Sequence, residues 1–137
     1  MSVHAERSDL VTRALPWLLL VYCAASLVHF THNAEYLANY PNLPAWISRG
    51  SIYFAWLAIF SVGLCGYLLY RGRHALPGLI LMAIYAALGL DGLLHYSRAP
   101  LVAHTAGMNA TIWFEVVTAT VALGAVAWLA VHRLLRR

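Results

Sequence analysis

Four long apolar stretches, separated by short polar segments, dominate the chain. They cover about residues 14–38, 46–70, 75–97 and 104–132. Each is long enough to cross the hydrocarbon core of a bilayer, which takes roughly 20 residues of helix. Proline, glycine and asparagine residues punctuate the short connections, and such connections favour helices that run alternately up and down. The pattern therefore predicts an all-α, up-down-up-down four-helix membrane bundle, with residues 1–137 forming one domain.

Composition and charge agree with this prediction and give it an orientation. Of the 137 residues, 62% are hydrophobic and 10% are charged, and the nine positive charges are all arginines. One side of the predicted bundle holds Arg7, Arg13, Arg71, Arg73, Arg133, Arg136 and Arg137, and the other holds Arg49 and Arg98. Because cytoplasmic loops are enriched in positive charge, both termini are expected in the cytoplasm, in a bacterial inner membrane. No basic patch interleaved with aromatic residues indicates nucleic-acid binding.

Polar side chains interrupt three of the four stretches. The first contains His29, His32, Asn33 and Glu35, the third Asp91 and His95, and the fourth His104 and Glu115. In antiparallel helices these positions all fall in the outer half of the membrane. An ionisable group in hydrocarbon is costly, so the group of positions predicts one functional site that opens outward.

Helical phase, at about 100° per residue, indicates which of these side chains can meet. His29 and Asn33 share one face of the first helix, and Glu35 points away from it. Asp91 and His95 are four residues apart and share a face of the third helix. The second stretch adds Tyr53 and Trp56 as an aromatic wall that could bind a ligand or cofactor. The side chains expected to converge are His29, His32, Asn33, Asp91, His95, His104 and Glu115.

Imidazole and carboxylate groups are ligands of transition metals, so the main hypothesis is a copper, iron or zinc site. The candidate ligands are His29, His32, Asp91, His95, His104 and Glu115. The spacing Asp91-x3-His95-x8-His104 resembles the copper sites in the membrane subunit of particulate methane monooxygenases. Haem is a less favoured metal alternative, with His29 and His95 as axial ligands. The apolar surroundings predict a membrane lipid or another hydrophobic small molecule as the substrate.

Two alternatives need no metal. In the first, Glu115, Asp91 and Asn33 carry out acid–base catalysis on a lipid, for example the isomerisation of a double bond, while Tyr53 and Trp56 stabilise a cationic centre by cation–π attraction. In the second, the chain is a small structural or assembly subunit whose polar face meets a partner helix. Polar groups in membrane bundles also hydrogen-bond to one another simply to fix packing. Polar groups that face outward would favour a partner.

Three features together resemble a known family. A histidine is followed four residues later by a polar residue in the first span (His29, Asn33), an acid comes late in the third (Asp91), and the fourth span contains tryptophan. This layout resembles the EXPERA membrane fold of sterol isomerases and the sigma-2 receptor, which implies four spans with cytoplasmic ends and acid–base chemistry on a sterol-like lipid. The isomerases carry a glutamate where this chain has Asn33. Gly63 and Gly66 fit close helix packing, either inside the bundle or in a homodimer or larger membrane complex.

Overall fold

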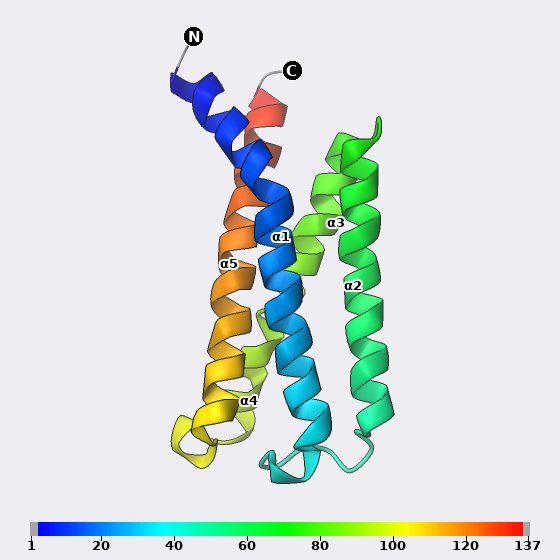
Figure 1. The fold of residues 1–137 in the computed structure, drawn as a ribbon, viewed down its shortest axis with the longest axis vertical. Helices are drawn as coiled ribbons and strands as arrows, with labels where there is room; N and C mark the ends of the chain where they lie inside the picture. Colours follow the sequence, from blue (N-terminus) through cyan, green and yellow to red (C-terminus); the bar gives the residue numbers. More distant parts are fainter. Residues whose placement is uncertain (1–2, 136–137) are drawn as a thin grey trace.

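The computed structural model describes residues 3–135, which are helical apart from short connections and contain no strand. The long helices are α1 (Val3–Glu35), α2 (Arg49–Arg71), α3 (Ala75–Leu88) and α5 (Ala106–Leu135) (Figure 1). The short elements are η1 (Leu37–Asn39), η2 (Asp91–Leu93), α4 (Leu94–Arg98) and η3 (Leu101–Ala103). The prediction of an all-helical chain is confirmed.

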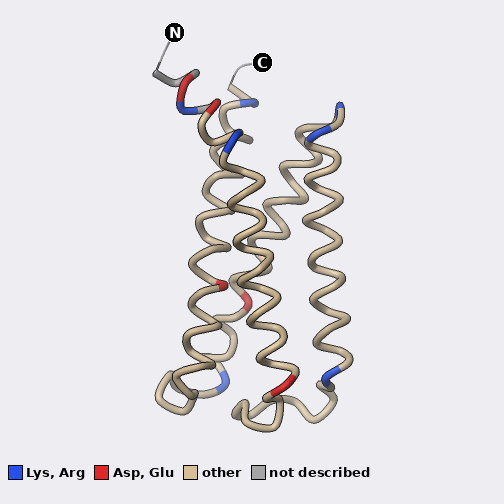
Figure 2. The backbone as a smooth tube through the Cα atoms, viewed as in Figure 1, with Lys and Arg blue, Asp and Glu red and all other residues tan. Residues whose placement is uncertain are grey.

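Within residues 3–135, four segments are long and apolar enough to cross a membrane: Asp9–Glu35, Arg49–Arg71, Ala75–Arg98 and Ala106–Leu135. Their bounds lie within a few residues of the predicted stretches. Both ends of the described chain lie at one end of the molecule (Figure 1), and the basic positions lie near the two ends of the bundle (Figure 2). Arg136 and Arg137, which contribute to the predicted orientation, lie outside the described residues. The side of the membrane on which the termini lie stays a prediction.

The helices pack mainly as two close pairs, α1 with α5 and α2 with α3, and α3 also packs on α5. Leu15, Leu79, Met82 and Val126 form one buried cluster, and a second surrounds Tyr22. Many leucine, valine and aromatic side chains on the outside of the bundle are exposed, as a lipid-facing surface requires. The contact between α1 and α2 is less extensive than these three contacts, and the cavities described below lie along it.

Glycines allow the close approach of α2 to α3. A Cβ atom on Gly66 would lie 2.9 Å from the backbone nitrogen of Met82, and one on Gly63 would lie 2.6 Å from the ring of Tyr85. Gly78 faces the backbone of α2 at Gly66 and Tyr70. Of the two alternatives left by the sequence, these glycines therefore serve packing inside the bundle.

The third span is interrupted, where the sequence predicted one continuous helix over 75–97. Helix α3 ends at Leu88, and the chain passes through a 3-10 segment at Asp91–Leu93 before α4 begins. The amide of Gly89 bonds to Ala86 O at 3.2 Å, so Tyr85 O loses its normal helical partner and accepts the Tyr22 hydroxyl at 3.0 Å instead. A Cβ atom on Gly89 would lie 2.5 Å from the Tyr22 hydroxyl oxygen. The break thus needs glycine and is held by α1.

We expect Gly66→Ala to lower the free energy of unfolding by about 1–3 kcal/mol, because the added methyl group meets backbone atoms that cannot move aside. Thermal unfolding of the purified protein in detergent measures the change. The matched control is Gly124→Ala on α5, where a Cβ atom would meet nothing within 4 Å. That variant should be neutral or more stable, since alanine is the better helix former. Equal stability of the two variants would contradict this account of the α2–α3 contact.

Candidate functional site

The centre of the site is a histidine and a carboxyl group buried between α1 and α5. His29 is 2% exposed and Glu115 is 0% exposed. Nε2 of His29 lies 3.6 Å from Oε2 of Glu115. Figure 2 shows acidic positions inside the bundle, far from the basic positions at its ends. Both side chains are therefore sealed from lipid, as the phase of the two helices predicts.

Asn33 joins this pair to the third span. Its side-chain nitrogen donates to Nε2 of His29 at 3.1 Å and to Nε2 of His95 at 3.4 Å. An amide nitrogen is only a donor, so both Nε2 atoms accept, and each neutral imidazole carries its proton on Nδ1. Nδ1 of His29 lies 3.4 Å from the hydroxyl of Thr111. The amide thus fixes the tautomer of both rings.

This arrangement has a consequence for the buried pair. The lone pair on Nε2 of His29 faces an oxygen of Glu115, and two acceptor atoms repel each other in an apolar interior. A proton on Glu115 makes this contact attractive, because its O–H then faces the lone pair of Nε2. A proton on Nε2 would instead face the amide donor of Asn33. The pair is therefore arranged to hold one proton, carried by Glu115 and facing His29.

A cavity of about 350 Å³ lies against the pair, between α1, the start of α2 and the segment that contains η2 and α4. Its walls are His29, Phe30, Asn33, Leu43, Trp46, Ile47, Ser51, Ile52, Ala55, Asp91, Gly92, Leu94, His95 and Arg98. A Cβ atom on Gly92 would lie 3.7 Å from Oε2 of Glu115. Because Gly92 has no side chain, only a thin wall separates that carboxyl from the cavity. The cavity thus combines apolar walls with two histidines, an amide, a carboxyl group, a hydroxyl group and the guanidinium group of Arg98.

A second set of polar contacts lies beside this centre. Nδ1 of His32 lies 2.8 Å from the hydroxyl of Tyr40. Tyr40 lies in the connection between α1 and α2 and is 5% exposed. Burial raises the pKa of Tyr40 to about 12, so its phenol stays protonated at ordinary pH. His32 and Tyr40 therefore form a polar pair beside the site, in addition to the pair of His29 and Thr111.

His104 is a neighbour of His95 but does not line the cavity. Its Nδ1 donates to the carbonyl oxygen of Pro100 at 3.1 Å, and its ring centre lies 6.2 Å from that of His95. The residue is 6% exposed, and its Nε2 atom is buried without a hydrogen-bond partner. The structure therefore places His104 beside the site.

The predicted aromatic wall does not line this cavity. The hydroxyl of Tyr53 donates to Glu35 at 2.8 Å, and Arg49 binds the same carboxylate at 2.6 Å, so these residues form an exposed link between α1 and α2. Trp56 stacks on Phe60 with ring centres 5.3 Å apart. The aromatic walls of the cavity are Phe30 and Trp46 instead. Glu35 points away from the site, as its helical phase predicts.

The geometry gives no support to the metal hypothesis. Within residues 3–135, no three side chains from His, Cys, Asp and Glu are placed to hold one metal ion. Among the candidate ligands, His29 and His95 both face the amide of Asn33, and His32 bonds to Tyr40. The same amide occupies the position between the two rings suggested as haem ligands. Hydrogen bonds, not shared coordination, thus connect these residues.

Neither Tyr40 nor Thr111 is named in the sequence analysis as a residue of the site. Thr111 lies four residues before Glu115 on α5, which is the signal that could have found it. Tyr40 lies in a connection, where helical phase gives no direction. Only the path of the chain after η1 brings its ring to 5.0 Å from His95 and 5.8 Å from His32, centre to centre.

We expect Tyr40→Phe to lower the free energy of unfolding by about 1 kcal/mol, because it removes the hydrogen bond between the Tyr40 hydroxyl and the half-buried ring of His32. Thermal unfolding in detergent measures the loss. Tyr36→Phe is the control, since the Tyr36 ring also contacts His32 but its side chain is 53% exposed. In an alkaline titration, the tyrosinate absorbance that is missing from Tyr40→Phe should appear only near pH 12, following the raised pKa. A signal near the ordinary value of 10 would contradict the burial of this phenol.

Comparisons with known proteins leave the interpretation to the geometry. No family model, no curated protein and no solved structure matches the chain.

Proposed function

We propose that the chain is a multi-pass protein of the bacterial inner membrane that isomerises a lipid-soluble molecule by acid–base catalysis. In this proposal the bundle is up-down-up-down, both termini lie in the cytoplasm, and the cavity opens in the outer half of the membrane. The observation that carries it is the buried pair of His29 and Glu115 against a cavity with apolar walls. A group that holds one exchangeable proton, beside a space for a hydrophobic molecule, is what such a reaction needs.

The residues can be given roles in a balanced reaction. The proton held by His29 and Glu115 is added to one carbon of a double bond, so a C–H bond forms there and the neighbouring carbon becomes cationic. Asp91, which lines the same cavity, takes a proton from the carbon beyond, and the double bond moves by one position. Asp91 then releases this proton to water and the pair takes up a proton from water, which restores both groups. Phe30 and Trp46 offer aromatic faces to the cationic centre. No oxidant or reductant is consumed.

Two observations favour this function over the alternatives. The polar side chains of the site face the interior, with His29, His104 and Glu115 at most 6% exposed, whereas a subunit that meets its partner through a polar face would turn them outward. A metal centre needs several donors at one point, and the described residues provide no such group. The resemblance to the EXPERA isomerases favours the same class of chemistry.

Solvent deuterium tests the proposal even while the substrate is unidentified. Purified protein in nanodiscs made from total bacterial lipid is incubated in D2O, and the lipids are then searched by mass spectrometry for deuterium bound to carbon. We expect one lipid class to gain deuterium with the wild type. In His29→Gln and Glu115→Gln the rate should fall about a hundredfold to ten-thousandfold, the usual effect of removing a general acid or base.

Glu35→Gln is the matched control, because it changes a carboxylate that pairs with Arg49 at the surface and should leave the rate unchanged. A folded wild type that labels no lipid would overturn the proposal. Elemental analysis gives a second test. Stoichiometric copper, iron or zinc in the wild type that is absent from His29→Ala and His95→Ala would also overturn it and restore the metal hypothesis.

A further inference from the structure

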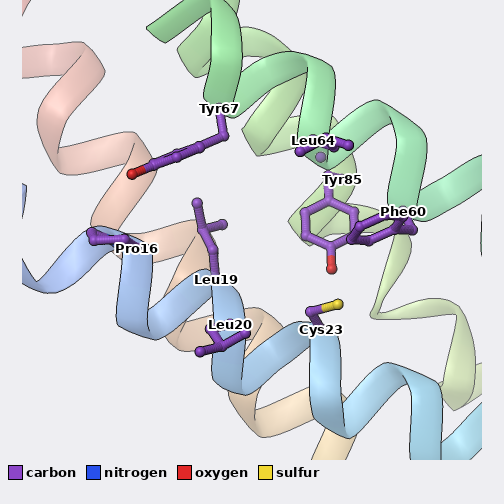
Figure 3. Close-up of a pocket in the computed structure, with 9 residues that line it drawn as sticks. Pro16, Leu19, Leu20, Cys23, Phe60, Leu64, Tyr67 and Tyr85 are labelled. Atoms are coloured by element: carbon purple, nitrogen blue, oxygen red, sulfur yellow. The ribbon is translucent and has the colours of Figure 1, made fainter. Parts of the chain in front are cut away.

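A second cavity lies between α1 and α2, deeper in the bundle than the cavity beside His29, which we call the outer cavity. Its volume is about 190 Å³, and its walls include Leu19, Leu20, Cys23, Phe60, Tyr67 and Tyr85. Figure 3 shows side chains of α1 and α2 around this space, with Cys23 and Tyr85 pointing toward each other at one side of it. Its lining is almost wholly apolar, so it lacks the polar partners that would hold water. We call this space the inner groove.

The inner groove and the outer cavity follow one another along the same pair of helices. On α1 the outer cavity includes Asn33 and the inner groove includes Leu19. These positions are 14 residues apart, or about 21 Å along a helix. This length exceeds the hydrocarbon thickness of one bilayer leaflet, which is about 15 Å, so the two spaces together extend beyond a single leaflet. Both spaces lie along the contact between α1 and α2, which is less extensive than the contacts of α1 with α5 and of α2 with α3. This α1–α2 seam therefore holds two spaces in line, and the outer one adjoins the polar site.

The outer cavity contains a hydrogen-bond acceptor that no donor satisfies. Oδ1 of Asn33 is buried and has no hydrogen-bond partner, and Asn33 lines the outer cavity. Its amide nitrogen is already used by His29 and His95. A carbonyl oxygen can only accept, so a molecule that satisfies it must bring a donor such as a hydroxyl group.

From these observations we propose that the α1–α2 seam binds a long single-chain alcohol. Its hydroxyl group donates to Asn33 in the outer cavity, and its chain runs past Phe60 into the inner groove. The inference rests on the proposed function, because it names the class of lipid on which the His29 and Glu115 pair acts. A double bond in the part of the chain next to the hydroxyl group would then lie beside that pair.

Photo-crosslinking tests this directly. Octanol and hexadecanol, each with a diazirine at the end of the chain, are added to the protein in phosphatidylcholine nanodiscs, and the labelled residues are identified by mass spectrometry. We expect the octyl probe to label the walls of the outer cavity and the hexadecyl probe to label the inner groove. An excess of unlabelled hexadecanol should reduce both signals several-fold, and the methyl ether of hexadecanol, which lacks the donor, should compete poorly.

Two variants distinguish labelling by a probe bound in the inner groove from labelling by a probe on the exposed surface of α1. Cys23→Phe fills the inner groove and should reduce labelling by the hexadecyl probe several-fold while leaving the octyl probe unaffected. Val21→Phe adds the same bulk on the exposed side of α1 and should change neither. Leu64→Trp, at the groove wall on α2, repeats the test if Cys23→Phe folds poorly.

The outcomes distinguish the two proposals. Groove labelling that is not reduced by competitor, or is equal in Cys23→Phe and Val21→Phe, would overturn the inference. If the octyl probe still labelled the outer cavity and lost this label in Asn33→Leu, the proposed function would stand alone. Absence of specific labelling by either probe, together with no lipid deuteration, would overturn both.

Discussion

Hydrocarbon solvates neither charge nor an unpaired hydrogen-bonding group, and this constraint decides where each polar residue of the bundle lies. The arginines of the described residues lie near the two ends of the bundle, and Glu35 is neutralised at the surface by Arg49. The groups that must lie within the membrane, His29, Asn33 and Glu115, turn inward and contact one another. The same constraint limits them to protonation states in which each contact is attractive. A structural requirement and a chemical capability therefore have one origin.

The sequence predicts the outline of this structure well. Span length and hydropathy are local properties, so four spans could be placed to within a few residues. Helical phase correctly brought His29, Asn33 and Glu115 to the interior and sent Glu35 outward, because α1 and α5 are regular through those positions. The predicted orientation across the membrane rests on the distribution of arginines alone, because no contact within the fold depends on which side faces the cytoplasm.

Helical phase gave a wrong prediction where the helix itself is interrupted. The third span breaks at Gly89, a consequence of contacts with Tyr22 and Ala119 that lie far away in the sequence. Tyr53 and Trp56 were placed in the site because they share a helix face, but the link to Glu35 and the stack on Phe60 hold them elsewhere. The metal hypothesis rests on the number and spacing of histidine and carboxylate residues in the sequence. The distances between those ligands depend on how the helices cross, which no spacing within one helix records.

The break at Gly89 also divides the chain into parts under different demands. Before it, α2 and α3 approach so closely that glycines are required, and few side chains can be exchanged there. After it, residues 90–105 form short elements that wrap one side of the outer cavity and contribute little to that helix packing. Substitutions that change the shape of the cavity can therefore accumulate in this cap while the scaffold stays unchanged. The lining of the cavity can thus diverge during evolution without first requiring a gain in stability.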